Sequence, residues 1–175
     1  MKKLLTSIVA VVLLLTVPFL QSCSKDPIKI GLKFTNLNFT IPAGDKYQTA
    51  TVTIKKSDWQ KFITDAGQTF DFNKVKKLDF KSFKLSVDGS KVLDEFDFAD
   101  LKFAKTNNTS EEKIAYISTI ADGSKEVSFS SNYFDAKSYL AEDEFLAKVV
   151  IFRNYPGVAY TFTGDLELEV EYSQK

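Results

Sequence analysis

The sequence predicts a mainly β protein, an antiparallel β-sandwich of about eight strands with one short capping helix near 58–66. Three observations predict this class. Apolar and polar residues alternate at a period of two in segment after segment, which is the pattern of half-buried strands. Clusters of Gly, Pro, Asn and Asp separate these segments and indicate turns. The chain also contains 16 phenylalanines, which suits a core of packed aromatic strands.

The first two strands are expected at 28–41 and 49–55. In the first strand the apolar phase slips at Thr35 and Asn36, which indicates a bulge or a break. The Pro-Ala-Gly-Asp segment at 42–45 predicts a turn between the two strands. The second strand alternates threonines with apolar residues, so we expect threonine side chains along one of its faces.

One segment carries a strong helix signal. Ser57 is a candidate N-cap, and Gln60, three residues later, completes a capping box with it. Apolar residues then recur every three or four positions, and Gly67 can supply the left-handed stop. Trp59 on the apolar side of this helix could line a ligand cleft. The alternative is that Trp59 anchors the helix to the core.

The middle of the chain predicts a hairpin and a central strand. A strand at 78–87 runs into Asp88-Gly89, a dipeptide that favours a tight hairpin because both central residues need positive φ. We therefore expect a paired return strand that begins near Val92. The strand at 114–120 is apolar on both faces, which predicts a central position in its sheet.

The last third of the chain predicts a helical turn and two long strands. The turn is expected at 135–140, with Asp135 as its cap. The strand at 144–153 is apolar on both sides, and the strand at 158–172 keeps one apolar row in which only Gly164 is missing. Three glutamates line the other face of this last strand and need lysines opposite them. These glutamates are Glu167, Glu169 and Glu171, and the candidate lysines are Lys29, Lys33, Lys81 and Lys84.

The N-terminus carries an export signal. Lys2 and Lys3 precede an apolar run at 4–20 that is too short and too interrupted, by Pro18 among others, to favour a membrane-spanning helix. The run ends in Leu-Gln-Ser-Cys, and this segment resembles the lipobox of bacterial lipoproteins. Its residues are Leu20, Gln21, Ser22 and Cys23.

The lipobox resemblance implies that Cys23 is lipidated and becomes the new N-terminus. Stable anchoring takes more than one acyl chain. The chain then divides into a signal peptide at 1–22, a lipid-anchored tether at 23–27 and a single sandwich domain at 28–175. The residues around the cysteine look like the start of lipoproteins from Bacteroidota, which implies an outer-membrane location, facing either the periplasm or the cell surface. The strand pattern resembles the immunoglobulin-like or jelly-roll domains of many such lipoproteins.

Composition excludes several classes of chemistry. The chain has no histidine and one cysteine, so catalytic triads that use histidine, histidine metal sites and disulfides are ruled out. It contains 23 basic and 23 acidic residues, and nothing in this balance favours nucleic acid. Arg153 is its sole arginine, so bidentate clamps for phosphate are scarce. No cofactor is expected.

Two groups of residues are candidate sites. Acidic residues between 94 and 100 could hold calcium, which takes six to eight oxygens, but their spacing is not that of a calcium loop. The alternative is a strand with a solvated acidic face. The metal candidates are Asp94, Asp97 and Asp100. Aromatic residues near expected loops could stack on sugar rings, or else plug the ends of the core. The ligand-binding candidates are Trp59, Tyr133, Tyr139 and Tyr155.

The leading hypothesis is a non-enzymatic, lipid-anchored module of the cell envelope that binds a glycan or an envelope protein. The lipobox, the missing catalytic residue types and the strand pattern motivate it. One alternative is an envelope hydrolase that acts on glycans with two carboxylates. The other is a purely structural or assembly lipoprotein.

Overall fold

The computed structural model describes residues 26–174, except 88, 90, 108–109 and 155–156. The expected signal peptide at 1–22, the lipobox and the candidate Tyr155 lie outside the described residues. Within the described residues, no helix has the length and apolar character needed to cross a bilayer.

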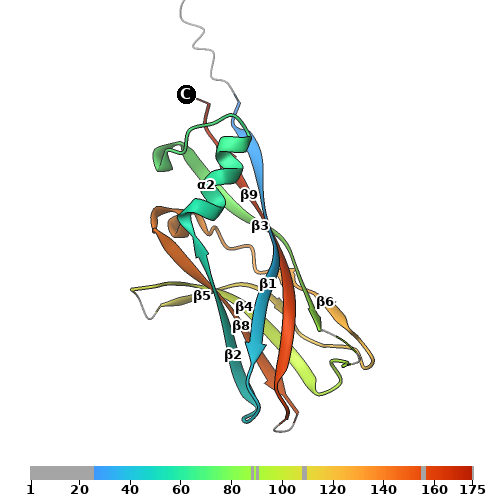
Figure 1. Cartoon of the computed structure of the whole chain (residues 1–175). Helices are drawn as coiled ribbons and strands as arrows, with labels where there is room; N and C mark the ends of the chain where they lie inside the picture. The colour runs from blue at the N-terminus through green and yellow to red at the C-terminus, as the bar shows by residue number, and fades with distance from the viewer. Residues whose placement is uncertain (1–25, 88, 90, 108–109, 155–156, 175) are drawn as a thin grey trace, which may run out of the picture.

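The described chain folds into two antiparallel sheets that face each other (Figure 1). The four-stranded sheet contains, in spatial order, β1 (Ile28–Ile41), β9 (Tyr160–Tyr172), β3 (Val75–Val87) and β6 (Glu126–Ser128). The five-stranded sheet contains β2 (Tyr47–Lys55), β8 (Glu144–Arg153), β4 (Phe96–Lys105), β5 (Glu111–Ile117) and β7 (Ser130–Ser131). The predicted mainly β sandwich is confirmed.

The strand order is that of a jelly roll. When the two-residue β7 is set aside, eight strands remain. Counted one to eight along the chain, so that β8 becomes the seventh and β9 the eighth, they lie in the orders 1-8-3-6 and 2-7-4-5. The chain crosses between the sheets from β1 to β2, from β2 to β3 and from β3 to β4. An immunoglobulin domain instead keeps its first two strands in one sheet. Of the two expected architectures, the structure therefore has the jelly roll.

The core lies between the sheets, and Gly164 of β9 sits at its most crowded point. The inward residues of β9 alternate along the strand as predicted, and Gly164 occupies one place in that row. A Cβ atom at Gly164 would lie 2.7 Å from Cε2 of Phe39 and 2.8 Å from Cε2 of Phe83. The two rings pack edge to face with centroids 5.9 Å apart. Glycine is needed here because the rings meet over the backbone of β9.

The expected slip in the first strand is confirmed. The register of β1 against β9 shifts between Phe34 and Leu37, and Asn36 adopts a left-handed φ of +57°. The Asn36 amide donates to Oδ1 of Asp165 at 3.0 Å. The bulge thereby brings the second half of β1 back into phase with the core.

The helix is α2 (Lys56–Asp65), and its predicted cap is wrong. The helix follows β2 directly, so Ser57 lies inside its first turn instead of before it. The Lys55 amide donates to Oδ2 of Asp58 at 3.0 Å and takes the place of the expected Ser57–Gln60 box. The predicted end is confirmed, because Gly67 has a φ of +76°.

Two 3₁₀ helices complete the described elements, η2 (Phe72–Lys74) and η3 (Lys137–Ala141). The second matches the turn predicted at 135–140. Oδ1 of Asp135 accepts from the Lys137 amide at 2.9 Å and from the Leu78 amide at 3.1 Å. The N-cap position is held by Ala136, so the predicted cap is wrong by one residue, and Asp135 instead ties the start of the turn to β3.

The hairpin predicted at Asp88-Gly89 is wrong. Gly89 does turn the chain, with a φ of +74°, but β3 and β4 lie in different sheets and do not pair. The segment at Val92 is not a strand, and β4 begins only at Phe96. Local alternation cannot distinguish a return within one sheet from a crossing to the other sheet, and a jelly roll crosses here.

The strand predicted at 114–120 to be central lies close to a sheet edge. It is β5, whose outer neighbour is the two-residue β7, and Tyr116 on it is 38% exposed. Strands β8 and β4 lie further from the β7 edge than β5 does. In β8 the second apolar face, which includes Val150 and Phe152, is half-buried and not covered by another layer.

The outer face of the four-stranded sheet is a ladder of ion pairs, as the glutamate row predicted. Lys29 and Lys81 both pair with Glu169, at 3.1 Å and 3.2 Å, and Lys33 pairs with Glu167 at 3.3 Å. The hydrogen bond from Lys29 lowers the pKa of Glu169. This face is therefore charged but locally neutral.

Candidate ligand-binding surface

Two aromatic candidates from the sequence lie in the core. Trp59 of α2 is fully buried, and its ring centroid lies 4.7 Å from that of Phe70. The prediction that Trp59 lines a ligand cleft is therefore wrong. Tyr139 is also buried, and its hydroxyl donates to the Phe103 carbonyl at 3.1 Å. Burial raises the pKa of Tyr139 to about 12. Both residues pack in the core, as the alternative interpretation expected, and neither offers a free ring face to a ligand.

The three metal candidates do not come together. Asp94 accepts a hydrogen bond from the Gly123 amide, while Asp100 pairs with Lys113 at 2.8 Å. Asp97 contributes its backbone carbonyl, which accepts from the Ile120 amide at 3.1 Å. Among the residues that the structure describes, no group of three His, Cys, Asp or Glu side chains could hold a metal ion. The solvated-strand alternative is correct only in part, because Asp97 and Asp100 lie on β4, whereas Asp94 and Glu95 lie in the turn before it and Glu95 is buried.

Tyr133 is the sequence candidate that remains on the surface. It is 96% exposed, and it adopts a left-handed φ of +53° while its amide donates to Oγ of Ser131 at 2.9 Å. It stands on the rim of a cavity of about 270 Å³. Lys77 and Asp79 in the wall pair at 2.7 Å, and the hydrogen bond to Asp79 raises the pKa of Lys77. The charged groups of this cavity thus satisfy each other.

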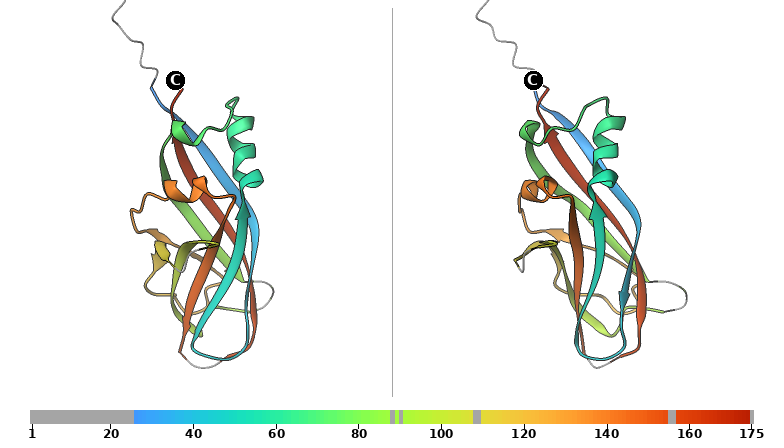
Figure 2. Two further views of the ribbon diagram at one scale, coloured as in Figure 1. Left: turned by 90° about the vertical axis from the view of Figure 1, so that its left-hand side faces the viewer. Right: turned by 60° about the vertical axis from the view of Figure 1, so that its left-hand side comes forward.

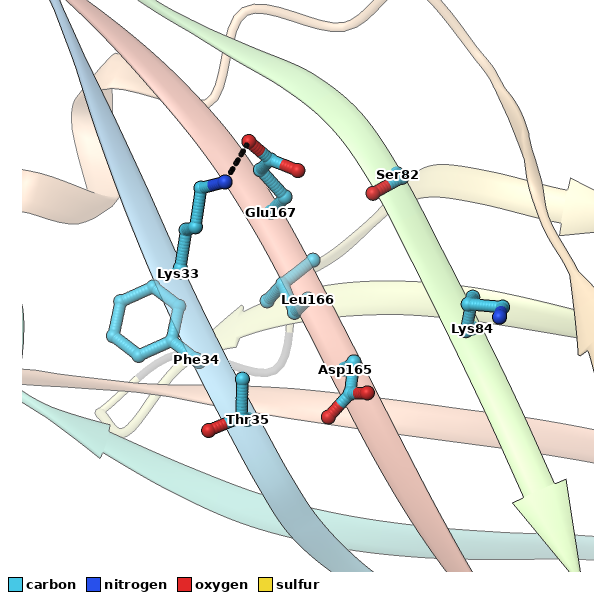
Figure 3. A pocket seen from close by; sticks show the side chains of 8 residues that line it. All are labelled: Lys33, Phe34, Thr35, Ser82, Lys84, Asp165, Leu166 and Glu167. Carbon is cyan, nitrogen blue, oxygen red and sulfur yellow. Dashed lines mark ion pairs between the residues drawn. The ribbon is translucent and has the colours of Figure 1, made fainter.

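Two other hollows are lined by charged side chains that already have partners. One hollow of about 190 Å³ lies beside the bulge of β1. Figure 3 shows that Lys33, in its wall, pairs with Glu167 of the neighbouring strand β9. A cavity of about 290 Å³ is lined by three consecutive acidic residues. Among them, Glu142 pairs with Lys105 at 2.8 Å, and Asp143 pairs with Lys56 at 3.1 Å.

An aromatic cluster on the outer face of the five-stranded sheet is different in kind. Tyr47 of β2, Phe152 of β8 and Phe98 of β4 are paired in register across three adjacent strands. The two phenylalanine rings stack at 5.0 Å with an interplanar angle of 11°. We call these three residues the aromatic cluster.

Tyr47 leans against the stacked phenylalanines instead of standing in line with them. Its centroid lies 4.8 Å from that of Phe152 and 6.5 Å from that of Phe98, so the three centroids form a triangle. Tyr47 nevertheless remains 65% exposed, whereas both phenylalanines are half-buried. The cluster thus presents one open aromatic ring on a support of two others.

A buried ion pair fixes the backbone beneath the cluster. Arg153, which follows Phe152, is fully buried, and its guanidinium lies 5.3 Å from the ring centroid of Phe96. Its Nη2 donates to the Pro42 carbonyl at 3.2 Å, and its amide donates to the Lys46 carbonyl at 2.8 Å. Nη1 lies 4.0 Å from Oε2 of Glu95, which is an electrostatic distance and too long for a hydrogen bond.

Gly44 and Gly157 pair through their backbones beside this ion pair. The Gly44 amide donates to the Gly157 carbonyl at 3.1 Å, and the Gly157 amide donates back at 3.3 Å. A Cβ atom at Gly157 would overlap Oε2 of Glu95. The chain connections from β1 to β2 and from β8 to β9 are therefore held together at the same end of the molecule as the cluster.

The surroundings of the cluster carry hydroxyl groups and ion pairs. The next row across the sheet contains Thr49, Val150, Asp100 and Tyr116, in which Lys113 neutralises Asp100. In the row beyond, Lys102 and Lys148 both pair with Glu111. The hydrogen bond from Lys148 lowers the pKa of Glu111.

The cluster lies at the end of the sandwich remote from both chain ends. Figure 1 shows the start of β1 and the end of β9 together beside α2, with the connections from β1 to β2 and from β8 to β9 at the opposite end. The turned views in Figure 2 show the same separation. Tyr47 is the first residue of β2, so it stands at that remote end.

Comparisons with known proteins find distant structural likenesses. Neither a protein-family model nor a curated protein sequence matches the chain. Among solved structures, a decameric capsid protein of the virus BFDV is 14% identical, with a TM-score of 0.38 over 85% of this chain and 98% of that one. A chain from the structure of Cocksfoot mottle virus is 9% identical, with a TM-score of 0.33 over 89% of this chain and 88% of that one.

A further likeness is to carbohydrate-binding modules of the β-sandwich superfamily described as promiscuous in specificity. The identity is 6%, and the TM-score is 0.38 over 83% of this chain and 54% of that one. All three likenesses are distant. The jelly-roll assignment comes from the strand order of the protein itself.

The sequence contained one signal for the cluster. The strand at 144–153 is apolar on both faces, and an uncovered second face would expose Phe152 in a row with residues of its neighbours. Which residues complete that row depends on the pairing of β2, β8 and β4, and these strands are not consecutive in the chain. Tyr47 and Phe98 could therefore not be assigned from local patterns.

Proposed function

We propose that this protein is a non-enzymatic binding module of the cell envelope, held by lipid at Cys23 and binding its ligand or partner through the aromatic cluster. The observation that carries the proposal is the position of the cluster. A 65%-exposed tyrosine, supported by two stacked phenylalanines, stands at the end of the sandwich remote from the N-terminus. Exposed aromatic residues on a rigid surface are typical anchors of binding sites.

The proposed anchor and the cluster fit one orientation. Residues 23–27, even when extended, reach about 17 Å, so a lipid on Cys23 keeps the near end of the sandwich at the membrane. Strand β1 has 14 residues, which at about 3.3 Å each span roughly 45 Å. The cluster would then face away from the bilayer, where a ligand can reach it.

Lysines hold three described carboxylates in the charged form. Hydrogen bonds from lysines lower the pKa of Glu111, Glu126 and Glu169. A glycosidase instead needs a carboxylic acid whose pKa is raised, so that it can protonate the leaving group. These three groups are suited to holding lysines on the two outer faces.

The binding proposal is tested by comparing Tyr47→Ala with Tyr133→Ala. Both replace an exposed tyrosine, so neither is expected to change folding, but only Tyr47 belongs to the cluster. The full chain, immobilised, is exposed to solubilised envelope and to a panel of polysaccharides, and bound material is quantified. We expect Tyr47→Ala to lose binding and Tyr133→Ala to keep it. Equal retention by the wild type and Tyr47→Ala would overturn the proposal.

The anchor is tested separately by Cys23→Ala followed by cell fractionation. We expect the wild-type protein in the membrane fraction and the variant in the soluble fraction. A variant that stays membrane-bound would contradict lipid tethering and leave the binding proposal to be judged by its own test.

A further inference from the structure

We infer that the aromatic cluster takes a neutral pyranose sugar, stacked on the ring of Tyr47, as part of a glycan chain. This inference rests on the proposed function and names the ligand class for the same surface. Three properties of the surface carry it: the geometry of the open ring, the hydroxyl groups beside it and the charged rows that bound the apolar patch.

The open ring has the shape that sugar stacking requires. One face of a pyranose ring is a patch of C–H groups, and the negative face of an aromatic ring attracts such weakly positive hydrogens. Tyr47 rests against Phe152 on one side and is 65% exposed, so a free face remains. The support of Phe98 and Phe152 restrains the tyrosine ring, which reduces the entropy lost when a ligand covers it.

The surroundings match a ligand that has hydroxyls and no charge. Thr49 and Tyr116 lie in the row beside the cluster and offer hydroxyl groups that can both donate and accept. The charged groups of the same face are already paired, Asp100 with Lys113 and Glu111 with Lys102 and Lys148. A phosphate or a carboxylate would compete for lysines that already have partners, and the exposed Lys46 beside Tyr47 is the reason why the test includes an anionic polymer.

The apolar patch at the cluster is bounded by charged side chains. It consists of Tyr47, Phe98, Phe152 and Val150, with Tyr116 beside it, and the row of Lys102 and Lys148 follows it directly. A stable protein interface buries about 800 Å² on each side around an apolar centre, so a protein partner would have to cover this lysine row as well. One open aromatic ring with hydroxyl groups beside it suits one or two sugar units.

The test measures binding of four neutral hexasaccharides to the full chain, in a detergent that has no sugar head group. The probes are maltohexaose, cellohexaose, laminarihexaose and mannohexaose, with polygalacturonic acid as the anionic comparison. We expect at least one neutral probe to bind and the anionic polymer to bind more weakly. We expect Tyr47→Ala to reduce affinity by about tenfold or more, as loss of an aromatic anchor does.

Two further variants separate stacking from other contributions. Tyr47→Phe keeps the ring and should stay within about threefold of the wild type, because the stacking face is unchanged. Tyr133→Ala should bind like the wild type. Binding of none of the neutral probes, or binding that Tyr47→Ala leaves intact, overturns the inference.

Failure of the inference can be distinguished from failure of the proposed function. Suppose no neutral probe binds, yet the chain retains an envelope protein or self-associates in sedimentation, and Tyr47→Ala abolishes this. The cluster is then a binding surface for another class, and only the sugar assignment falls. If neither a probe nor envelope material binds in a way that depends on Tyr47, both fail together.

Discussion

Replacing Gly164 by alanine should destabilise the sandwich without touching its surface. The new Cβ would lie 2.7 Å from Phe39 and 2.8 Å from Phe83, closer than real Cβ atoms approach carbon. Both rings are fully buried, and Phe83 also packs on Phe129 at 4.9 Å, so neither ring can move away freely. Overpacking of this kind costs about 1–3 kcal/mol.

The net effect is smaller than the clash alone, because alanine restricts the unfolded chain more than glycine does. That contribution stabilises by about 0.4–1 kcal/mol and leaves a net loss of roughly 1–2 kcal/mol. For a domain of this size the melting temperature should fall by about 2–8 °C. Chemical denaturation of the full chain, followed by circular dichroism, measures the free energy of unfolding directly.

Gly31→Ala is the matched control for this prediction. Gly31 lies on β1, beside β9 in the same sheet, but its Cβ would meet only Cε of Lys33, at 3.9 Å. We expect this variant to be as stable as the wild type or slightly more stable. Adding Phe39→Leu to Gly164→Ala should recover part of the lost stability by making room. A Gly164→Ala variant as stable as Gly31→Ala would refute the reasoning about ring packing.

Three other predictions follow from the same contacts. Arg153→Met should cost about 3–5 kcal/mol of unfolding free energy because it leaves Glu95 buried without its cation, and adding Glu95→Gln should recover much of that loss in denaturant titrations. Equal losses in the single and double variants would contradict this. Burial raises the pKa of Tyr139 from 10 to about 12, so the folded state favours the neutral phenol. The resulting contribution to the free energy of unfolding is fully present below pH 10 and is lost as the pH rises towards 12. Tyr139→Phe should flatten this alkaline loss in melts between pH 9 and 12, and an unchanged profile would count against it. The pKa of Glu169 is lowered by its hydrogen bond from Lys29, so its contribution is present above the unfolded pKa and disappears as the pH falls through the folded value. Glu169→Gln should therefore narrow the stability difference between neutral and acidic solution, and because the pair is exposed to solvent the effect should stay below about 1 kcal/mol.

The sequence predicted those features that depend on neighbouring residues. The slip at Thr35 and Asn36, the row interrupted by Gly164 and the helical turn at 137–141 each follow from a short segment read by its period or its turn chemistry. The lysines opposite Glu167 and Glu169 were also expected, although one of them, Lys84, pairs with Glu126 instead.

What the sequence could not predict depends on where the chain goes after each strand. Gly89 has a positive φ, as a tight turn needs, yet β4 enters the other sheet, because long-range burial decides which strand β4 pairs with. The helix cap moved to Lys55 because β2 continues into the helix without a loop. The aromatic cluster combines three strands distant in sequence, so Tyr47 and Phe98 carried no local signal.

The claim that the ligand binds at the cluster can be tested most directly with a fluorescent reporter at position 47. The chain has one tryptophan, Trp59, and it is fully buried, so Tyr47→Trp adds a single exposed indole. Titration with the four neutral hexasaccharides should shift the emission of this indole to shorter wavelength as a sugar covers it. The same reporter placed by Tyr133→Trp should stay unchanged. A shift at position 133 without one at position 47 would contradict the account and place the site at the cavity beside Tyr133 instead.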